Sequence, residues 1–83
     1  MNGNAIIKLV IHKRNFETIL EVPLTMSAND LVMALNDTYE LGIDVADMKS
    51  WYLKTENPIA LLKGNKTLGD YGVRNGTVIN ITE

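Results

Sequence analysis

The chain has 83 residues, of which 46% are hydrophobic, and its net charge is −2. This length allows one hydrophobic core, so we expect residues 1–83 to form a single domain, and the apolar content is too high for a disordered chain. The eight basic residues are scattered, which argues against nucleic acid as a partner. The absence of cysteine excludes disulfides and thiolate metal sites and favours an intracellular setting.

No targeting or membrane segment is visible in the sequence. The first residues lack the charged and apolar regions of a signal peptide. The longest apolar runs fall far short of the ~20 residues that a helix needs to cross a bilayer. We therefore expect no direct membrane insertion.

The first half of the chain predicts a β-hairpin. Residues 5–12 are mostly apolar and β-branched, and alternation places Ile7, Leu9 and Ile11 on an inner face. Residues 16–22 predict a second strand that pairs antiparallel with the first across a polar turn at residues 13–15. Pro23 ends the second strand because it has no N–H to donate.

A helix is predicted from Ala28 to Leu41. Ser27 is a typical N-cap and Asp30 suits the first turn, whereas Gly42 accepts the left-handed conformation that follows a helix. Apolar residues recur at helical spacing, so one face of the helix docks on a sheet. The members of this stripe are Ala28, Leu31, Val32, Ala34, Leu35 and Tyr39, with Met26, Met33 and Met48 expected to fill gaps around the helix.

The second half predicts three further strands. Residues 51–54 and 59–62 form the third and fourth strands, separated by a loop at Asn57–Pro58. Residues 67–73 are irregular, with Leu68, Tyr71 and Val73 as buried candidates. Residues 77–82 form the last strand after an Asn-Gly turn, with Ile79 and Ile81 facing inward. The predicted fold is α+β: a mixed four- to five-stranded sheet with one helix packed on one face.

Two parts of the chain resemble known proteins of this architecture. The segment Thr-Leu-Gly-Asp-Tyr-Gly-Val-Arg-Asn-Gly-Thr-Val-Ile at residues 67–79 resembles the part of ubiquitin before its last strand, and the order of elements resembles the ubiquitin-like β-grasp fold. Val22-Pro23 before an aliphatic helix, Gly72-Val73 and Asn75-Gly76 resemble the YukD/EsaB family. That resemblance implies a cytoplasmic accessory or regulatory component of Gram-positive type VII secretion systems, which export WXG-type substrates.

The chain end separates this sequence from ubiquitin and the sulfur carriers. It reads Ile81-Thr82-Glu83, whereas those proteins are activated at a terminal Gly-Gly. We therefore expect a module that is not conjugated to other proteins. Two alternatives stay open: a ubiquitin-like adaptor of another complex and, less favoured, a carrier protein of the sulfur-transfer or ubiquitin-modifier type.

The sequence predicts no catalytic, cofactor or metal site. The single histidine, His12, is separated by a whole strand from Ser27, which acts as a helix cap. Acidic residues 37, 40, 44 and 47 lack the glycine-centred spacing of a calcium loop. We therefore expect no enzymatic activity.

We expect the chain to bind protein partners, including components of the secretion machinery, through the sheet face that the helix leaves open. Alternation places Lys8, Val10, Tyr52, Lys54, Val78, Asn80 and Thr82 on that face, and the predicted docking residues are Lys8, Tyr52, Lys54, Asn80 and Thr82. Polar Asn80 and Thr82 replace an apolar part of ubiquitin's contact face, so ubiquitin's own receptors should bind poorly. A one-residue slip of the third strand would expose Trp51 or Leu53 in place of Tyr52. The oligomeric state stays open.

Overall fold

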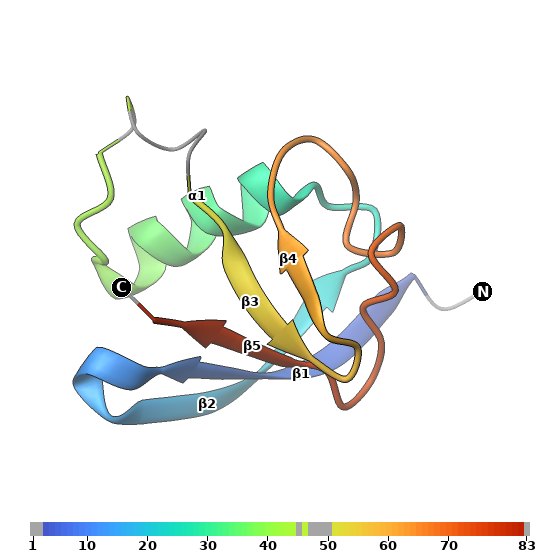
Figure 1. The fold of residues 1–83 in the computed structure, drawn as a ribbon, viewed down its shortest axis with the longest axis horizontal. Helices are drawn as coiled ribbons and strands as arrows, with labels where there is room; N and C mark the ends of the chain where they lie inside the picture. The colour runs from blue at the N-terminus through green and yellow to red at the C-terminus, as the bar shows by residue number, and fades with distance from the viewer. Residues whose placement is uncertain (1–2, 45, 47–50, 83) are drawn as a thin grey trace.

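A computed structural model describes residues 3–44, 46 and 51–82. Its five strands form one sheet in the order β2-β1-β5-β3-β4, and helix α1 covers one face (Figure 1). The predicted order of strands and helix is confirmed. The elements are β1 (Asn4–Ile11), the short 3-10 helix η1 (His12–Arg14), β2 (Phe16–Pro23), α1 (Ala28–Tyr39), β3 (Leu53–Glu56), β4 (Ala60–Leu62) and β5 (Val78–Ile81).

The central strand β1 carries the predicted inner face. It pairs antiparallel with β2 and parallel with β5. Ile7, Leu9 and Ile11 are at most 1% exposed, and Ile79 and Ile81 of β5 are buried beside them. The last strand is shorter than predicted, because Thr77 and Thr82 lie just outside its ladder.

The start of α1 agrees with the sequence, but its end does not. The Ser27 hydroxyl accepts a hydrogen bond of 3.1 Å from the backbone N–H of Asp30, as expected of an N-cap. The helix ends at Tyr39 and not at Leu41, because Glu40 adopts the left-handed conformation with φ of 51°.

Contacts from outside the helix explain this early end. Arg14, in the β1–β2 connection, donates from its guanidinium to the carbonyl oxygens of Tyr39 and Glu40. The Asn36 side chain also donates to the carbonyl of Ile43 and accepts from its N–H. Arg14 therefore satisfies the carbonyl of the last helical residue and that of the following residue from a distant part of the chain, while Asn36 fixes the backbone after the helix, and Gly42 is not needed as the stop.

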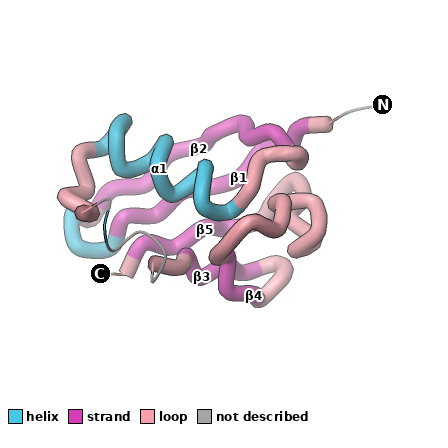
Figure 2. The backbone as a smooth tube through the Cα atoms, turned by 90° about the horizontal axis from the view of Figure 1, so that it is seen from above, coloured by secondary structure: helices cyan, strands magenta, loops and turns pink. Residues whose placement is uncertain are grey.

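The apolar stripe of α1 is narrower than predicted. Figure 2 shows α1 lying over one face of the sheet. The buried residues of the helix are Ala28, Leu31, Val32 and Leu35. Ala34 and Met33 are exposed, so their predicted places in the helix–sheet core were wrong. Met26 does pack against the core, whereas Met48 lies outside the described residues.

Strands β3 and β4 begin later in the chain than predicted. The third strand covers residues 53–56 in place of 51–54, and Ile59 lies in the turn before β4 with 91% of its surface exposed. Thr55 accounts for the shift, since it pairs with buried Ile79 and its hydroxyl donates to the carbonyl of Pro58 at 2.7 Å. A buried threonine thus extends the strand beyond its hydrophobic residues.

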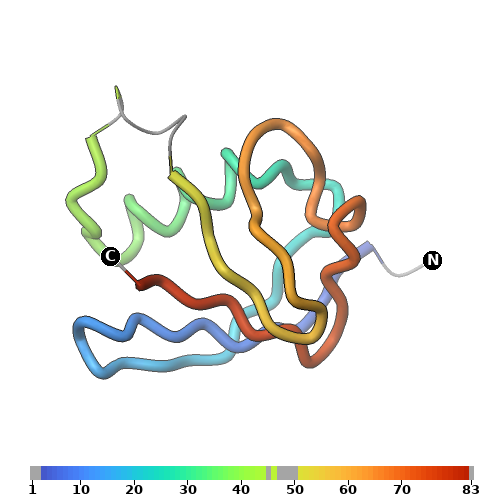
Figure 3. The backbone as a smooth tube through the Cα atoms, viewed as in Figure 1, coloured from blue at the N-terminus to red at the C-terminus, as the bar shows by residue number. Residues whose placement is uncertain are grey.

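The segment between β4 and β5 connects the start of the helix to the sheet (Figure 3). Its backbone carbonyls at residues 64 and 66 accept from the N–H groups of Asn29 and Ala28. Leu68 and Val73 are buried and Tyr71 is half-buried, which confirms the predicted anchors of this irregular segment. In the described part of the chain, no helix has the length and apolar character needed to span a bilayer.

Candidate functional site

The open face of the sheet is defined by strand register. Cross-strand pairing aligns Val10 of β1, Asn80 of β5, Lys54 of β3 and Leu61 of β4 in one line across the sheet. Neighbouring inner residues such as Ile79 alternate with this line and face the helix. The four strands therefore bring apolar, amide and ammonium groups together on one surface.

One end of this line forms a hollow of about 460 Å³, which we call the open-face hollow. Aliphatic side chains dominate one side, where Ile59 is 91% exposed and Leu61 50% exposed. Charged groups of Lys54 and Glu56 stand beside them. The residues that line the hollow are His12, Lys54, Thr55, Glu56, Ile59, Ala60, Leu61, Asn80 and Thr82.

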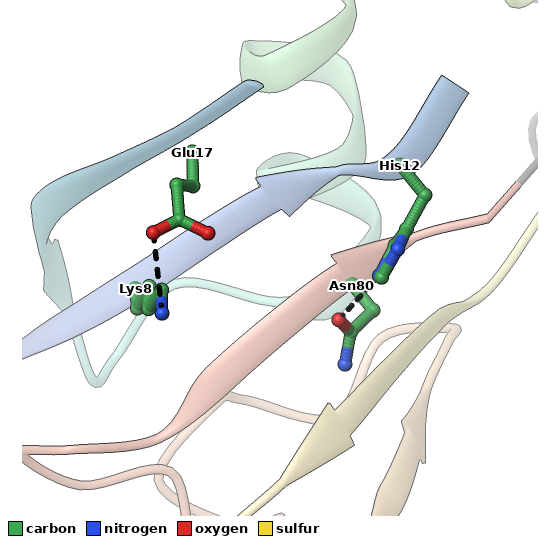
Figure 4. A network of polar contacts seen from close by, with 4 residues as sticks. All are labelled: Lys8, His12, Glu17 and Asn80. Atoms are coloured by element: carbon green, nitrogen blue, oxygen red, sulfur yellow. Dashed lines mark hydrogen bonds and ion pairs between the residues drawn. The ribbon is translucent and has the colours of Figure 1, made fainter. Parts of the chain in front are cut away.

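The floor of the open-face hollow is a chain of polar side chains centred on Asn80. Its Oδ1 lies 2.7 Å from Nε2 of His12 (Figure 4). Its Nδ2 donates to Oε2 of Glu56 at 3.0 Å. An ionised carboxylate only accepts hydrogen bonds, so the amide nitrogen must face Glu56 and the amide oxygen must face His12. His12 Nε2 therefore carries a proton and donates to Asn80.

This polar chain corrects one prediction. Asn80 was expected to be exposed on the open face, but it is only 8% exposed. It lies between exposed His12 and Glu56, which cover it from both sides. Burial of an amide is tolerated here because its oxygen and its nitrogen each have a partner.

Lys8 lies on the same face but outside the hollow. Its Nζ is 3.4 Å from Oε1 of Glu17, and both side chains are well exposed (Figure 4). Exposed ion pairs of this kind contribute little to stability, typically 0–1 kcal/mol. A partner can therefore replace Glu17 as the neighbour of the Lys8 ammonium group at a free-energy cost of about 1 kcal/mol or less.

The structure brings three of the five predicted docking residues together. Lys54, Asn80 and Thr82 line the open-face hollow, whereas Lys8 and Tyr52 do not. Tyr52 precedes β3 and is 45% exposed. The question of register is answered by its neighbours, because Leu53 is buried and Trp51 packs partly buried against the core.

Sequence comparison identifies the family. The model of the protein YukD from the WXG100 protein secretion system (Wss) matches residues 6–81. The chain belongs to the YukD family. No curated protein sequence matches it significantly.

Solved structures similar to this YukD-family chain share the ubiquitin-like β-grasp fold. A ubiquitin-like domain from tubulin-binding cofactor B is 27% identical, with a TM-score of 0.70 over 96% of this chain and 89% of that one. The ubiquitin-like domain of Dsk2 from Plasmodium falciparum is 15% identical, with a TM-score of 0.60 over 95% and 99%. A de novo design based on ubiquitin is also 15% identical, with a TM-score of 0.70 over 99% and 90%. The predicted fold class is confirmed.

Reasoning from the sequence missed six of the nine residues that line the hollow in this YukD-family chain. His12 was placed at the end of the first strand, Ile59, Ala60 and Leu61 were placed in the fourth strand, and Thr55 and Glu56 were assigned to no element. The spacing of Lys54 and Glu56, two apart, was a usable signal, since alternate residues of one strand share a face. No local sequence pattern relates these residues to His12, which lies in η1 directly after β1.

Among the described residues, ionisable side chains do not gather in a way that suggests a metal site. Within residues 3–44, 46 and 51–82, no group of three or more His, Asp or Glu side chains is placed to hold an ion. Asp47, Ser50 and Glu83 lie outside the described residues. The open-face hollow, with its aliphatic rim and satisfied polar floor, is suited to noncovalent contact with another molecule.

Proposed function

We propose that this chain is a noncovalent protein-interaction module, a cytoplasmic accessory or regulatory component of a bacterial WXG100 secretion system, and that it docks through the open-face hollow. Membership of the YukD family supports the connection to secretion. The observation that carries the docking role is the exposure of Ile59 and Leu61 beside a buried Asn80 whose amide oxygen and nitrogen each have a partner.

Exposed aliphatic side chains supply the affinity in this proposal. Ile59 projects from a turn and contributes little to the fold at 91% exposure, so a partner that covers it gains apolar burial. Complete burial of an isoleucine or leucine side chain is worth about 1.5–3 kcal/mol. On that scale Ile59 strengthens binding by roughly 10-fold to 150-fold, and Leu61, which is already half-buried, by roughly 4-fold to 13-fold.

Polar groups supply orientation and selectivity. Lys54, which carries an ammonium group, and Thr82, which carries a hydroxyl group, both line the hollow. A partner that places a carboxylate opposite Lys54 and an apolar side chain opposite Ile59 would complement both the charged and the apolar part of the hollow. Of the other predicted docking residues, we assign Lys8 and Tyr52 to the periphery of the contact, where side chains contribute less.

The test is export of a WXG-type substrate by a bacterium whose native gene is replaced by variants of this chain. Ile59→Ser and Lys54→Glu should each lower export and the co-purification of secretion-machinery proteins. Met33→Ser and Lys63→Glu are matched controls, because both positions are exposed and neither lines the hollow. The controls should behave as the native chain does.

Thermal unfolding of each purified variant separates loss of docking from loss of folding. We expect Ile59→Ser to keep the native melting temperature, since its side chain is almost fully exposed. Normal export by folded Ile59→Ser and Lys54→Glu proteins would contradict docking through the hollow. Intact-mass measurement of the chain purified from its own cells should show no covalent adduct, and a stable adduct would contradict noncovalent action.

A further inference from the structure

Strand β2 has an unpaired edge. It is the outermost strand of the sheet, and no described segment pairs with its far side (Figure 1). On β1, Lys8 donates its backbone N–H to Thr77 and the carbonyl of Ile6 accepts from Gly76, both at 3.0 Å. These backbone groups therefore point toward β5 and away from β2.

Register then identifies the backbone groups that point outward. Glu21 lies opposite Ile6 and Ile19 lies opposite Lys8 in the antiparallel β1–β2 pair. Because bonded and non-bonded pairs alternate, Glu17, Ile19 and Glu21 direct their N–H and C=O groups to the outer edge. Such an edge is a template for another strand.

A groove runs along the helix side of this edge. It encloses about 180 Å³ between β2 and α1, with Leu20 and Val22 on one wall and Leu31 and Leu35 at its base. We call it the β2–α1 groove. At the Phe16 end of β2, the rings of Phe16 and Tyr39 pack 5.7 Å apart. A strand added to β2 would place every second side chain in this apolar groove.

The charged residues next to this edge indicate which side chains an added strand should carry. Every charged residue of β2 and α1 is acidic: Glu17, Glu21, Asp30 and Asp37. Glu17 pairs with Lys8 at 3.4 Å, and Glu21 accepts from the Asn4 side chain at 2.8 Å, yet each carboxylate has lone pairs left for a further donor. A second copy is a poor occupant, because antiparallel pairing about Ile19 would set Glu17 against Glu21.

We propose that β2 accepts an extended basic segment of a partner protein as an additional antiparallel strand. Residues of that segment opposite Glu17 and Glu21 are lysine or arginine, and the residue opposite Ile19 is aliphatic. The residues between them are aliphatic and enter the β2–α1 groove. Backbone hydrogen bonds give affinity and the alternating side chains give selectivity. This surface is separate from the open-face hollow, so it does not depend on that assignment.

The probe is a blocked synthetic peptide of sequence Lys-Val-Ile-Val-Lys, titrated into the isotope-labelled chain at low salt. Amide signals of Glu17, Ile19 and Glu21 should shift, and their hydrogen exchange should slow. The peptide Glu-Val-Ile-Val-Glu should bind about tenfold more weakly, because two attractive cross-strand pairs become repulsive. N-methylation of the central isoleucine should abolish binding by removing a ladder donor.

Protein variants add a matched comparison. Glu17→Gln combined with Glu21→Gln should remove the preference for the lysine peptide, whereas Asp44→Asn, an exposed position outside β2, α1 and the hollow, should keep it. Ile19→Pro removes an outward N–H that β1 does not use, and Ile19→Ala keeps it, so only the proline variant should lose binding.

Several results would overturn the proposal. These are no binding of the lysine peptide at millimolar concentration, equal binding of both peptides, undiminished binding of the N-methylated peptide, or shifts confined to His12 and Asn80. Concentration-dependent dimerisation through β2 would likewise replace the basic segment with a second copy as occupant. Each of these results leaves the test of the open-face hollow untouched.

Discussion

Replacement of Asn80 by alanine tests whether the polar floor stabilises this protein. The substitution removes the hydrogen bonds to His12 and Glu56, at 2.7 and 3.0 Å. A typical bond contributes about 0.5–1.5 kcal/mol net, and one to a charged group about 1.5–3 kcal/mol. Both partners are exposed and regain water after the change, so we expect a total loss of about 1–3 kcal/mol.

Urea unfolding followed by the fluorescence of half-buried Trp51 measures this loss. For a chain of this size, each kcal/mol lowers the melting temperature by about 4–8 °C, so Asn80→Ala should melt roughly 5–20 °C lower. Thr82→Ala is the matched control in the same hollow. Its side chain is exposed and has no described hydrogen bond, so stability should change by less than about 0.5 kcal/mol.

A double-mutant cycle isolates the bond between His12 and Asn80. The single variants His12→Ala and Asn80→Ala, with their combination, should give a coupling free energy of about 0.5–1.5 kcal/mol. A coupling near zero, or an equal loss in Thr82→Ala, would refute the reasoning. The first result would mean that water replaces the bond without cost, and the second that the loss is not specific to the floor.

Two further predictions concern the fold. Ser27→Ala should lower the free energy of unfolding by about 1 kcal/mol, because the backbone N–H of Asp30 loses its hydrogen-bond acceptor. Thr25→Ala, two residues away, should change it little. Equal effects of the two variants in denaturant unfolding would argue against capping. In β4, Leu62→Ala should cost about 2–5 kcal/mol because this side chain is fully buried, and Leu61→Ala, half-exposed next to it, should cost far less. If calorimetry ranked the leucines in the opposite order, the assigned strand register would be wrong.

The sequence predicted correctly those structural features that depend on residues close together in the chain. The start of α1 follows from Ser27 and Asp30, and the inner face of β1 follows from alternation. The end of α1 was wrong, because Arg14 satisfies its carbonyls from the β1–β2 connection. Thr55 in β3 shows the same limit: its burial depends on pairing with Ile79, which lies far away in sequence.

Part of the candidate site could likewise be predicted from the sequence, and part could not. Alternation placed Lys54, Asn80 and Thr82 on one side of the sheet, and the structure brings them together. The burial of Asn80 could not be predicted from the sequence, because its partners come from η1 and from β3. Exposure of Ile59 was hidden for a related reason: its place in the turn depends on where the β3–β4 ladder begins.

The sequence by itself determined the order of the elements, the inner face of the sheet and the resemblance to the YukD family, since periodicity and turn residues are local properties. Tertiary structure alone decided which surface groups meet. It built the open-face hollow from residues in or next to η1, β3, β4 and β5, and it placed β2 at the edge of the sheet, beside an acidic helix, with no described strand on its outer side. Both surfaces arise from contacts between residues far apart in sequence, which no local pattern records.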